Sequence, residues 1–149
     1  MKNTRLEELR EEKELKAKEV AKELGIAEST YSEWENDKIP IPTRRLIELS
    51  NYYKINIDYL LKLTDKKEEI SEINKIDLKI IGNNLKEIRN DLKISLRQLG
   101  TTLNTSFSAF ASYERGEHLI QSHILIDLSK MYNYSIDWIL GKSNEKYLK

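Results

Sequence analysis

The chain has 149 residues, of which 39% are hydrophobic and 34% are charged, a balance typical of a soluble, globular protein with two small cores. Because 25 Lys and Arg offset 25 Asp and Glu, the net charge provides no general attraction to nucleic acid. No apolar run approaches the roughly 18 residues of a membrane span, and the charged N-terminus is unlike a secretion signal. We therefore expect a cytoplasmic protein without a membrane partner, and the absence of cysteine excludes disulfides and thiolate metal sites.

Apolar residues recur at helical intervals along the chain, and no stretch alternates as a strand would. In the first 65 residues the pattern predicts five short helices, at about 3–14, 17–24, 28–36, 43–52 and 56–63. Pro40 and Pro42 indicate an extended loop before the fourth helix.

The second half of the chain repeats this pattern. Residues 6–65 align with residues 85–144 at a constant offset of 79, without a gap, and fifteen of the sixty pairs are identical. A repeat of this length exceeds the roughly 20–50 residues of a solenoid unit and suits a small domain with its own core. We therefore predict an all-α chain of two modules, residues 1–65 and 81–149, with the second set of helices 79 residues after the first.

A connector, residues 66–80, joins the two modules. It lacks the Gly and Ser of a flexible tether and carries Ile70, Ile73 and Ile76 at helical spacing. We expect a helix or a docked segment rather than a free linker.

Side chains suited to helix N-caps stand near the predicted starts. Thr43 and Ser122 are expected to cap the fourth helix of each module, and Asn56 and Ser135 the fifth. Their side-chain oxygens can accept hydrogen bonds from backbone amides that lack an intrahelical partner.

The turn between the second and third helices of each module must be tight. Gly25 stands where the chain needs a positive φ, and its equivalent is Asn104, the next most tolerant type of residue. Ser95, with a Gln three residues later, predicts a capping box for the second helix. The windows 17–36 and 96–115 have the spacing of a helix-turn-helix.

Sequence motifs in both modules carry a family resemblance. In the first module they are LxELRxxKxL (6–15), VAxxLGI (20–26), STYSxWEN (29–36) and INIDYLL (55–61). In the second module they are LKEIRNDLKIS, SYERG and YSIDWILG. Both modules resemble the helix-turn-helix domain of the phage repressor and Cro family, also called the XRE family. The resemblance covers both repeats and implies two tandem five-helix, lambda-repressor-like domains.

An Arg and a Glu recur in both modules at a spacing of 25, as Arg10 with Glu35 and as Arg89 with Glu114. In the family that the chain resembles, such a pair bridges the first helix to the end of the third. The resemblance therefore implies a structural role for these four residues.

The resemblance also implies that the third helix of each module enters the major groove of double-stranded DNA. The residues carried over to the first reading face are Glu28, Ser29, Thr30, Ser32 and Glu33. Those carried over to the second are Phe107, Ser108, Ala109, Ala111 and Ser112. The neighbouring candidates for phosphate contact are Lys16, Lys18, Asn36, Lys38, Arg44, Arg45, Arg97, Arg115 and His118.

These faces depart from the family pattern. Gln is common in the family at the position of Glu28 and Phe107, and Arg or Lys at that of Glu33 and Ser112. The two glutamates either accept from a cytosine amino group or form a solvated helix face. Phe107 packs on a thymine methyl group, on a protein partner or on the sister module.

Two functional hypotheses follow. The first is a DNA-binding transcriptional regulator of the phage or mobile-element type, acting as a repressor. The alternative is a degenerate helix-turn-helix protein that binds another regulatory protein, as an antirepressor does. Either a pseudo-dimer within one chain or a homodimer would present two reading helices.

Catalysis, metal binding and cofactors are not expected. His118 and His123 are five residues apart, which is not the spacing of two ligands on one helical face. The sequence also has no Gly-rich phosphate loop and no nucleophile motif.

Overall fold

The computed structural model describes residues 1–70 and 72–149. The described residues form ten helices and no strand, with one isolated antiparallel bridge between Tyr134 and Tyr147. The predicted all-α class is confirmed. None of the described helices is long and apolar enough to cross a membrane.

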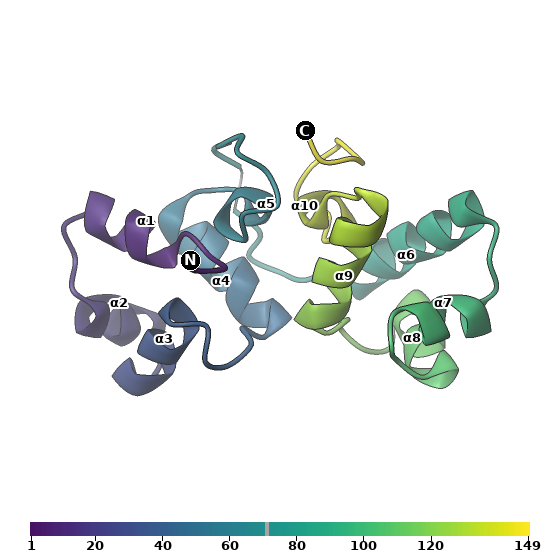
Figure 1. Cartoon of the computed structure of the whole chain (residues 1–149), viewed down its shortest axis with the longest axis horizontal. Helices are drawn as coiled ribbons and strands as arrows, with labels where there is room; N and C mark the ends of the chain where they lie inside the picture. Colours follow the sequence, from purple (N-terminus) through teal and green to yellow (C-terminus); the bar gives the residue numbers. More distant parts are fainter. Residues whose placement is uncertain (71) are drawn as a thin grey trace. The chain divides into compact units, whose positions relative to one another are not determined.

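The chain divides into two compact units, Met1–Ile70 and Ser71–Lys149 (Figure 1). The first unit contains α1 (Leu6–Glu12), α2 (Ala17–Leu24), α3 (Glu28–Glu35), α4 (Thr43–Tyr53) and α5 (Ile57–Leu60). The second contains α6 (Leu78–Leu92), α7 (Leu96–Thr102), α8 (Phe107–Glu114), α9 (Ser122–Tyr132) and α10 (Ile136–Ile139).

Both units have their core at the same positions of the repeat. Seven apolar side chains of the first unit are fully buried: Leu6, Val20, Tyr31, Leu46, Leu49, Ile57 and Leu60. Their equivalents are fully buried as well: Leu85, Leu99, Phe110, Leu125, Leu128, Ile136 and Ile139. One apolar pattern therefore builds one core twice.

The turns repeat as faithfully as the core. The described residues with positive φ fall into five pairs at the offset of 79: Glu14 and Lys93, Gly25 and Asn104, Asp37 and Gly116, Lys54 and Asn133, Lys62 and Gly141. Five of these ten positions hold Gly or Asn, of which only Gly25 and Asn104 were predicted. At the other five the fold imposes a left-handed conformation on Lys, Glu or Asp, at a cost that the surrounding packing must offset.

The cap predictions were partly right. Ser95 forms the predicted capping box, and the Ser135 hydroxyl accepts from the Trp138 amide at 3.1 Å. Thr43 and Ser122 were wrongly predicted as caps. The chain is still extended at the preceding residues, Pro42 and Gln121, so Thr43 and Ser122 are the first residues inside α4 and α9.

Asn56 precedes α5 but does not cap it through its side chain. Its Nδ2 donates to the Lys66 carbonyl at 3.1 Å, and its Oδ1 accepts from the Glu68 amide at 2.9 Å. The start of the connector is thus docked on the first unit. Residues 66–70 and 72–77 form no helix, so the helical alternative is wrong for them, and α6 begins at Leu78 with Asp77 as its cap.

Candidate nucleic-acid interface

Each unit carries a helix-turn-helix, formed by α2 with α3 and by α7 with α8. Gly25 has φ 69° and Asn104 has φ 54°, so both predicted left-handed positions are confirmed. The second turn is close, because a Cβ on Gly100 would lie 3.1 Å from the Thr105 carbonyl oxygen. The turn holds the third helix of the unit against the second and leaves its other face outward.

Aromatic side chains on the buried side of each third helix pack that helix against the core of its unit. Tyr31 meets Trp34 edge to face at 6.4 Å in α3, and Phe110 meets Tyr113 in the same manner at 6.1 Å in α8. The Tyr31 hydroxyl lies 2.6 Å from that of Tyr53 in α4. The buried side of each reading helix is thus fixed by packing, which orients its exposed side.

The two Arg–Glu pairs tie the first helix of each unit to the end of the third. Arg10 Nε and Nη2 donate to Glu35 at 2.7 and 3.1 Å, and Arg89 donates to Glu114 at 2.8 and 3.1 Å. The hydrogen bonds to Glu35 and Glu114 raise the pKa of both guanidinium groups. Because both glutamates are paired with an arginine in these bidentate contacts, they add no unpaired negative charge to the outer face.

The outward face of α3 is polar and acidic. Glu28 and Ser29 are exposed, whereas Thr30, Ser32 and Glu33 are half-buried. Asn36, just beyond the helix, donates to the Ser32 carbonyl at 2.9 Å and accepts from Lys2 Nζ at 3.1 Å. The amide of Asn36 is therefore already engaged within the unit.

The outward face of α8 has a different character. Phe107 and Ser108 are exposed, and Ala109 and Ser112 are half-buried. Ala111, which the resemblance assigned to this face, is only 7% exposed and packs inward. The Arg97 guanidinium of α7 lies 5.3 Å from the centroid of the Phe107 ring, within the range of a cation–π contact.

Most of the candidate phosphate-binding side chains are exposed: Lys16, Lys18, Asn36, Lys38, Arg44, Arg97, Arg115 and His118. Arg115 pairs with Glu117 through bonds of 2.8 and 3.0 Å, which raise the pKa of Arg115 and lower the pKa of Glu117. Arg45 is half-buried and pairs with Glu48 at 2.8 Å. Part of the positive charge near these helices is thus offset locally.

The sequence prediction did not include two cationic side chains that lie near the reading helices. Lys79 of α6 donates to the Arg115 carbonyl at the end of α8, at 3.1 Å, and Lys2 reaches Asn36 at the end of α3. Neither lies within the aligned repeats, so transfer by position did not reach them.

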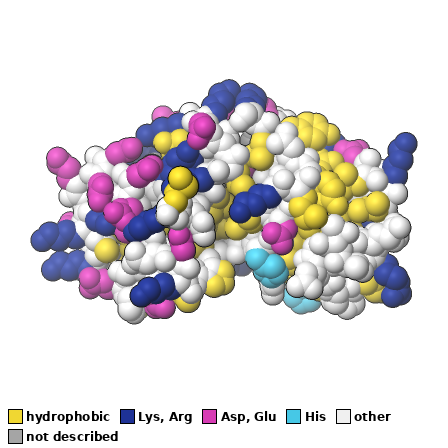
Figure 2. All heavy atoms as spheres, in the orientation of Figure 1, with side chains coloured by type: hydrophobic (Ala, Val, Ile, Leu, Met, Phe, Trp, Pro, Cys, Tyr) yellow, Lys and Arg dark blue, Asp and Glu magenta, His cyan; other side chains and the backbone are white. Residues whose placement is uncertain are grey.

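The two helix-turn-helix windows differ in free charge. Leaving aside the glutamates that pair with Arg10 and Arg89, residues 17–36 contain two lysines and four glutamates. Residues 96–115 contain two arginines and no carboxylate besides Glu114, although one of these arginines, Arg115, is paired with Glu117 just beyond the window. In the view of Figure 2, acidic side chains are scattered over the first unit, on the left, and are sparser over the second.

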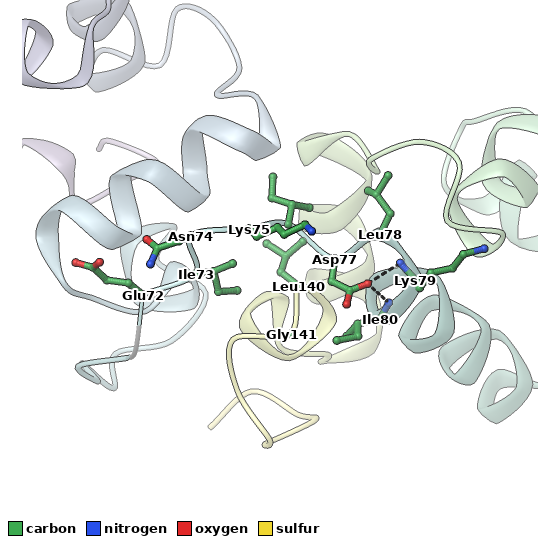
Figure 3. Close-up of a pocket in the computed structure, with 11 residues that line it drawn as sticks. Glu72, Ile73, Asn74, Lys75, Asp77, Leu78, Lys79, Ile80, Leu140 and Gly141 are labelled. Carbon is green, nitrogen blue, oxygen red and sulfur yellow. Dashed lines mark hydrogen bonds between the residues drawn. The ribbon is translucent and has the colours of Figure 1, made fainter.

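The second unit also contains a pocket of about 700 Å³, lined by residues 72–80 with Leu140 and Gly141 (Figure 3). Glu72 and Asp77 are the acidic residues of its lining, and Asp77 accepts from the amides of Lys79 and Ile80 at 3.0 and 3.2 Å, as the cap of α6. The described residues contain no cluster of three or more His, Cys, Asp or Glu that would hold a metal ion.

Comparison with known proteins agrees with this geometry. A helix-turn-helix domain model matches residues 3–66, and a second helix-turn-helix model matches residues 85–139. The chain is 35% identical over 89 residues to the HTH-type transcriptional regulator ImmR of Bacillus subtilis strain 168, and 34% identical over 83 residues to the HTH-type transcriptional regulator YobD of the same strain. These matches cover 58% and 56% of this chain, and 67% and 66% of the two relatives.

Among solved structures, the clp gene regulator ClgR of C. glutamicum matches 47% of this chain and 90% of its own, at 21% identity and a TM-score of 0.40.

The repeated core, the two tight turns and the matched models define a protein with tandem helix-turn-helix domains. The chain belongs to the XRE-type helix-turn-helix family of transcriptional regulators.

Proposed function

We propose that this chain is a sequence-specific DNA-binding repressor of the phage or mobile-element type, and that its second module is the one that reads the major groove. The observation that carries the proposal is the difference in free charge between the two windows. A surface that approaches phosphates gains affinity from each cation and loses it with each carboxylate.

The second window suits DNA in shape as well as in charge. Its exposed residues Phe107 and Ser108 and its half-buried Ser112 are small or apolar, so α8 can lie close to base edges. Arg97 and Lys79 flank it, from the start of α7 and from α6. Together with Arg115 they provide about three cationic contacts, from which we expect a slope of log affinity against log salt of about −3.

The first window favours a second candidate function, binding to a basic protein surface. Glu28 is exposed and Glu33 is half-buried on α3, while Glu19 and Glu23 lie on the neighbouring α2. Facing DNA, these carboxylates would be repelled by phosphates. If this second function is correct, the first module binds another regulatory protein, as the antirepressor alternative requires.

A fluorescence anisotropy titration against the DNA upstream of the chain's own gene separates the two candidates. The repressor should bind at low salt with the stated slope and should resist competition by an unrelated duplex. A reporter gene under that upstream region should lose expression when the chain is present. The absence of DNA binding at low salt would reject the proposal, and raised reporter expression would reject repression.

A further inference from the structure

Phe107 is an aromatic residue that the fold of the second unit does not need. Its side chain is 46% exposed at the first position of α8, and the core contact of this helix is made by Phe110 and Tyr113. The equivalent residue of the first unit is Glu28, which is exposed as well. Because the scaffold accepts a carboxylate at this position, the ring is available for an external contact.

Arg97 holds this ring from the neighbouring helix. Its guanidinium lies 5.3 Å from the ring centroid, and its position at the second residue of α7 keeps it at the surface. An Arg has five N–H donors, so a contact with the ring leaves donors for a phosphate. The pair therefore presents an apolar edge next to a cation, which suits the wall of a DNA groove.

The polar groups of α8 limit what the helix can read. The Ser112 hydroxyl donates to the Ala109 carbonyl at 2.7 Å, which leaves Ser112 only its acceptor capacity toward a base. The Ser106 hydroxyl accepts from the Ala109 amide at 3.0 Å, as the cap of the helix. α8 has no Arg, Lys, Asn or Gln, the side chains that pair bidentately with guanine or adenine.

An A·T base pair complements this surface. In the major groove thymine presents a C5-methyl group, which fits an apolar side chain, and adenine presents an amino donor, which fits an acceptor such as Ser112. A G·C pair presents no methyl group. The surface thus selects by a methyl contact where related helices use a bidentate side chain.

We propose that Phe107 is a specificity-determining residue that recognises the 5-methyl group of one thymine in the major groove. Arg97 is a positioning residue that holds the ring and contacts the adjacent phosphate. This inference rests on the proposed function, that the second module binds DNA.

Replacement of thymine by deoxyuracil tests the inference, because it removes the methyl group and keeps every base-pairing hydrogen bond. A duplex is first selected from a random library with the full chain, and its thymines are then replaced one at a time. We expect one position at which uracil weakens binding about fourfold, the equivalent of burying one methyl group. Phe107→Ala should bind the thymine and uracil duplexes equally, with an unchanged Tm because the ring is exposed.

Two further variants serve as controls. Glu28→Ala, at the same repeat position of the first unit, should keep the fourfold preference for thymine. Arg97→Ala should reduce that preference and also lower the salt slope by about 1, as the loss of one phosphate contact does. A purely structural Arg97 would leave both quantities unchanged in folded protein.

Equal affinity for thymine and uracil at every position would overturn the inference. A uracil effect that persists in Phe107→Ala and disappears in Ala109→Gly would overturn it as well, because the methyl group would then contact Ala109. Failure to select any duplex at low salt would refute the proposed function and this inference together, whereas a selected duplex with a flat uracil series would refute the inference alone.

Discussion

Replacing Arg10 by Ala should unfold the first unit at a much lower temperature than in the unmodified chain. Arg10 donates to both carboxylate oxygens of Glu35, at 2.7 and 3.1 Å, and to the Leu15 carbonyl at 3.0 Å. The Glu35 side chain is only 6% exposed. The variant therefore leaves a buried carboxylate without its cation and a carbonyl without its donor.

The size of the effect follows from that burial. Breaking a buried ion pair from one side costs about 3–5 kcal/mol, out of a total stability of about 5–15 kcal/mol for a typical domain. For a unit of this size each kcal/mol shifts Tm by about 4–8 °C. We therefore expect Tm of the first unit to fall by at least about 12 °C.

Differential scanning calorimetry of the full chain measures this shift, and hydrogen exchange assigns it to α1 and α3. The exposed neighbour Lys13 supplies the control, since Lys13→Ala should change Tm by little. Arg10→Met combined with Glu35→Leu removes both charges and should recover most of the loss. An unchanged Tm for Arg10→Ala, or a double variant less stable than the single one, would contradict the structural role of the pair.

Three further predictions concern stability. Gly82→Ala should lower the free energy of unfolding by about 1–3 kcal/mol despite the better helix propensity of Ala. The reason is that the new Cβ would lie 2.5 Å from the Glu114 carbonyl oxygen. An unchanged midpoint of urea unfolding would refute this close packing. Gly100→Ala should change stability by less than about 1 kcal/mol, because the better helix propensity of Ala offsets the 3.1 Å approach of its Cβ to the Thr105 carbonyl oxygen, and Ala21 already occupies the equivalent buried position. A loss above about 1 kcal/mol in the same assay would show that the second turn cannot yield. Burial raises the pKa of Tyr53 to about 12, so the folded state keeps a proton that the unfolded chain releases near pH 10. Stability should therefore be unaffected below pH 10 and decline toward pH 12, with Tyr53 contributing about 1.4 kcal/mol per pH unit in addition to Tyr31 and Tyr52 of the same unit, whose pKa values burial also raises. Tyr53→Phe should make the decline of the first unit shallower by about that one contribution in urea titrations, and an unchanged decline would contradict the raised pKa of Tyr53.

Much of the scaffold could be predicted because it is encoded locally and encoded twice. Helical periodicity predicted the helices, and the residue types at 25 and 104 signalled the left-handed turn. Lys54 and Lys62 gave no such signal, because Lys has no preference for that conformation, whereas their equivalents in the second unit, Asn133 and Gly141, have residue types that tolerate it. Tertiary packing fixes the backbone there.

The errors arose where a neighbouring residue or a partner distant in the sequence decides the structure. Asn56 has the residue type of a cap, but the nitrogen and the oxygen of its side-chain amide are both hydrogen-bonded to the connector. Thr43 also has the residue type of a cap, but Pro42 before it already occupies the cap position. For the reading face, the sequence indicated that Phe107 departs from the family pattern, whereas its contact with Arg97 depends on how closely α7 approaches α8.

The central claim, that the second module reads DNA and the first does not, is tested most directly by one matched pair of variants. Ser29 and Ser108 are the same residue at the same repeat position, and both are exposed. Ser108→Asp places a carboxylate toward the phosphates and should weaken binding to the selected duplex by at least about tenfold, whereas Ser29→Asp should leave the dissociation constant within about twofold. Equal losses in both variants, or a larger loss in Ser29→Asp, would contradict the account.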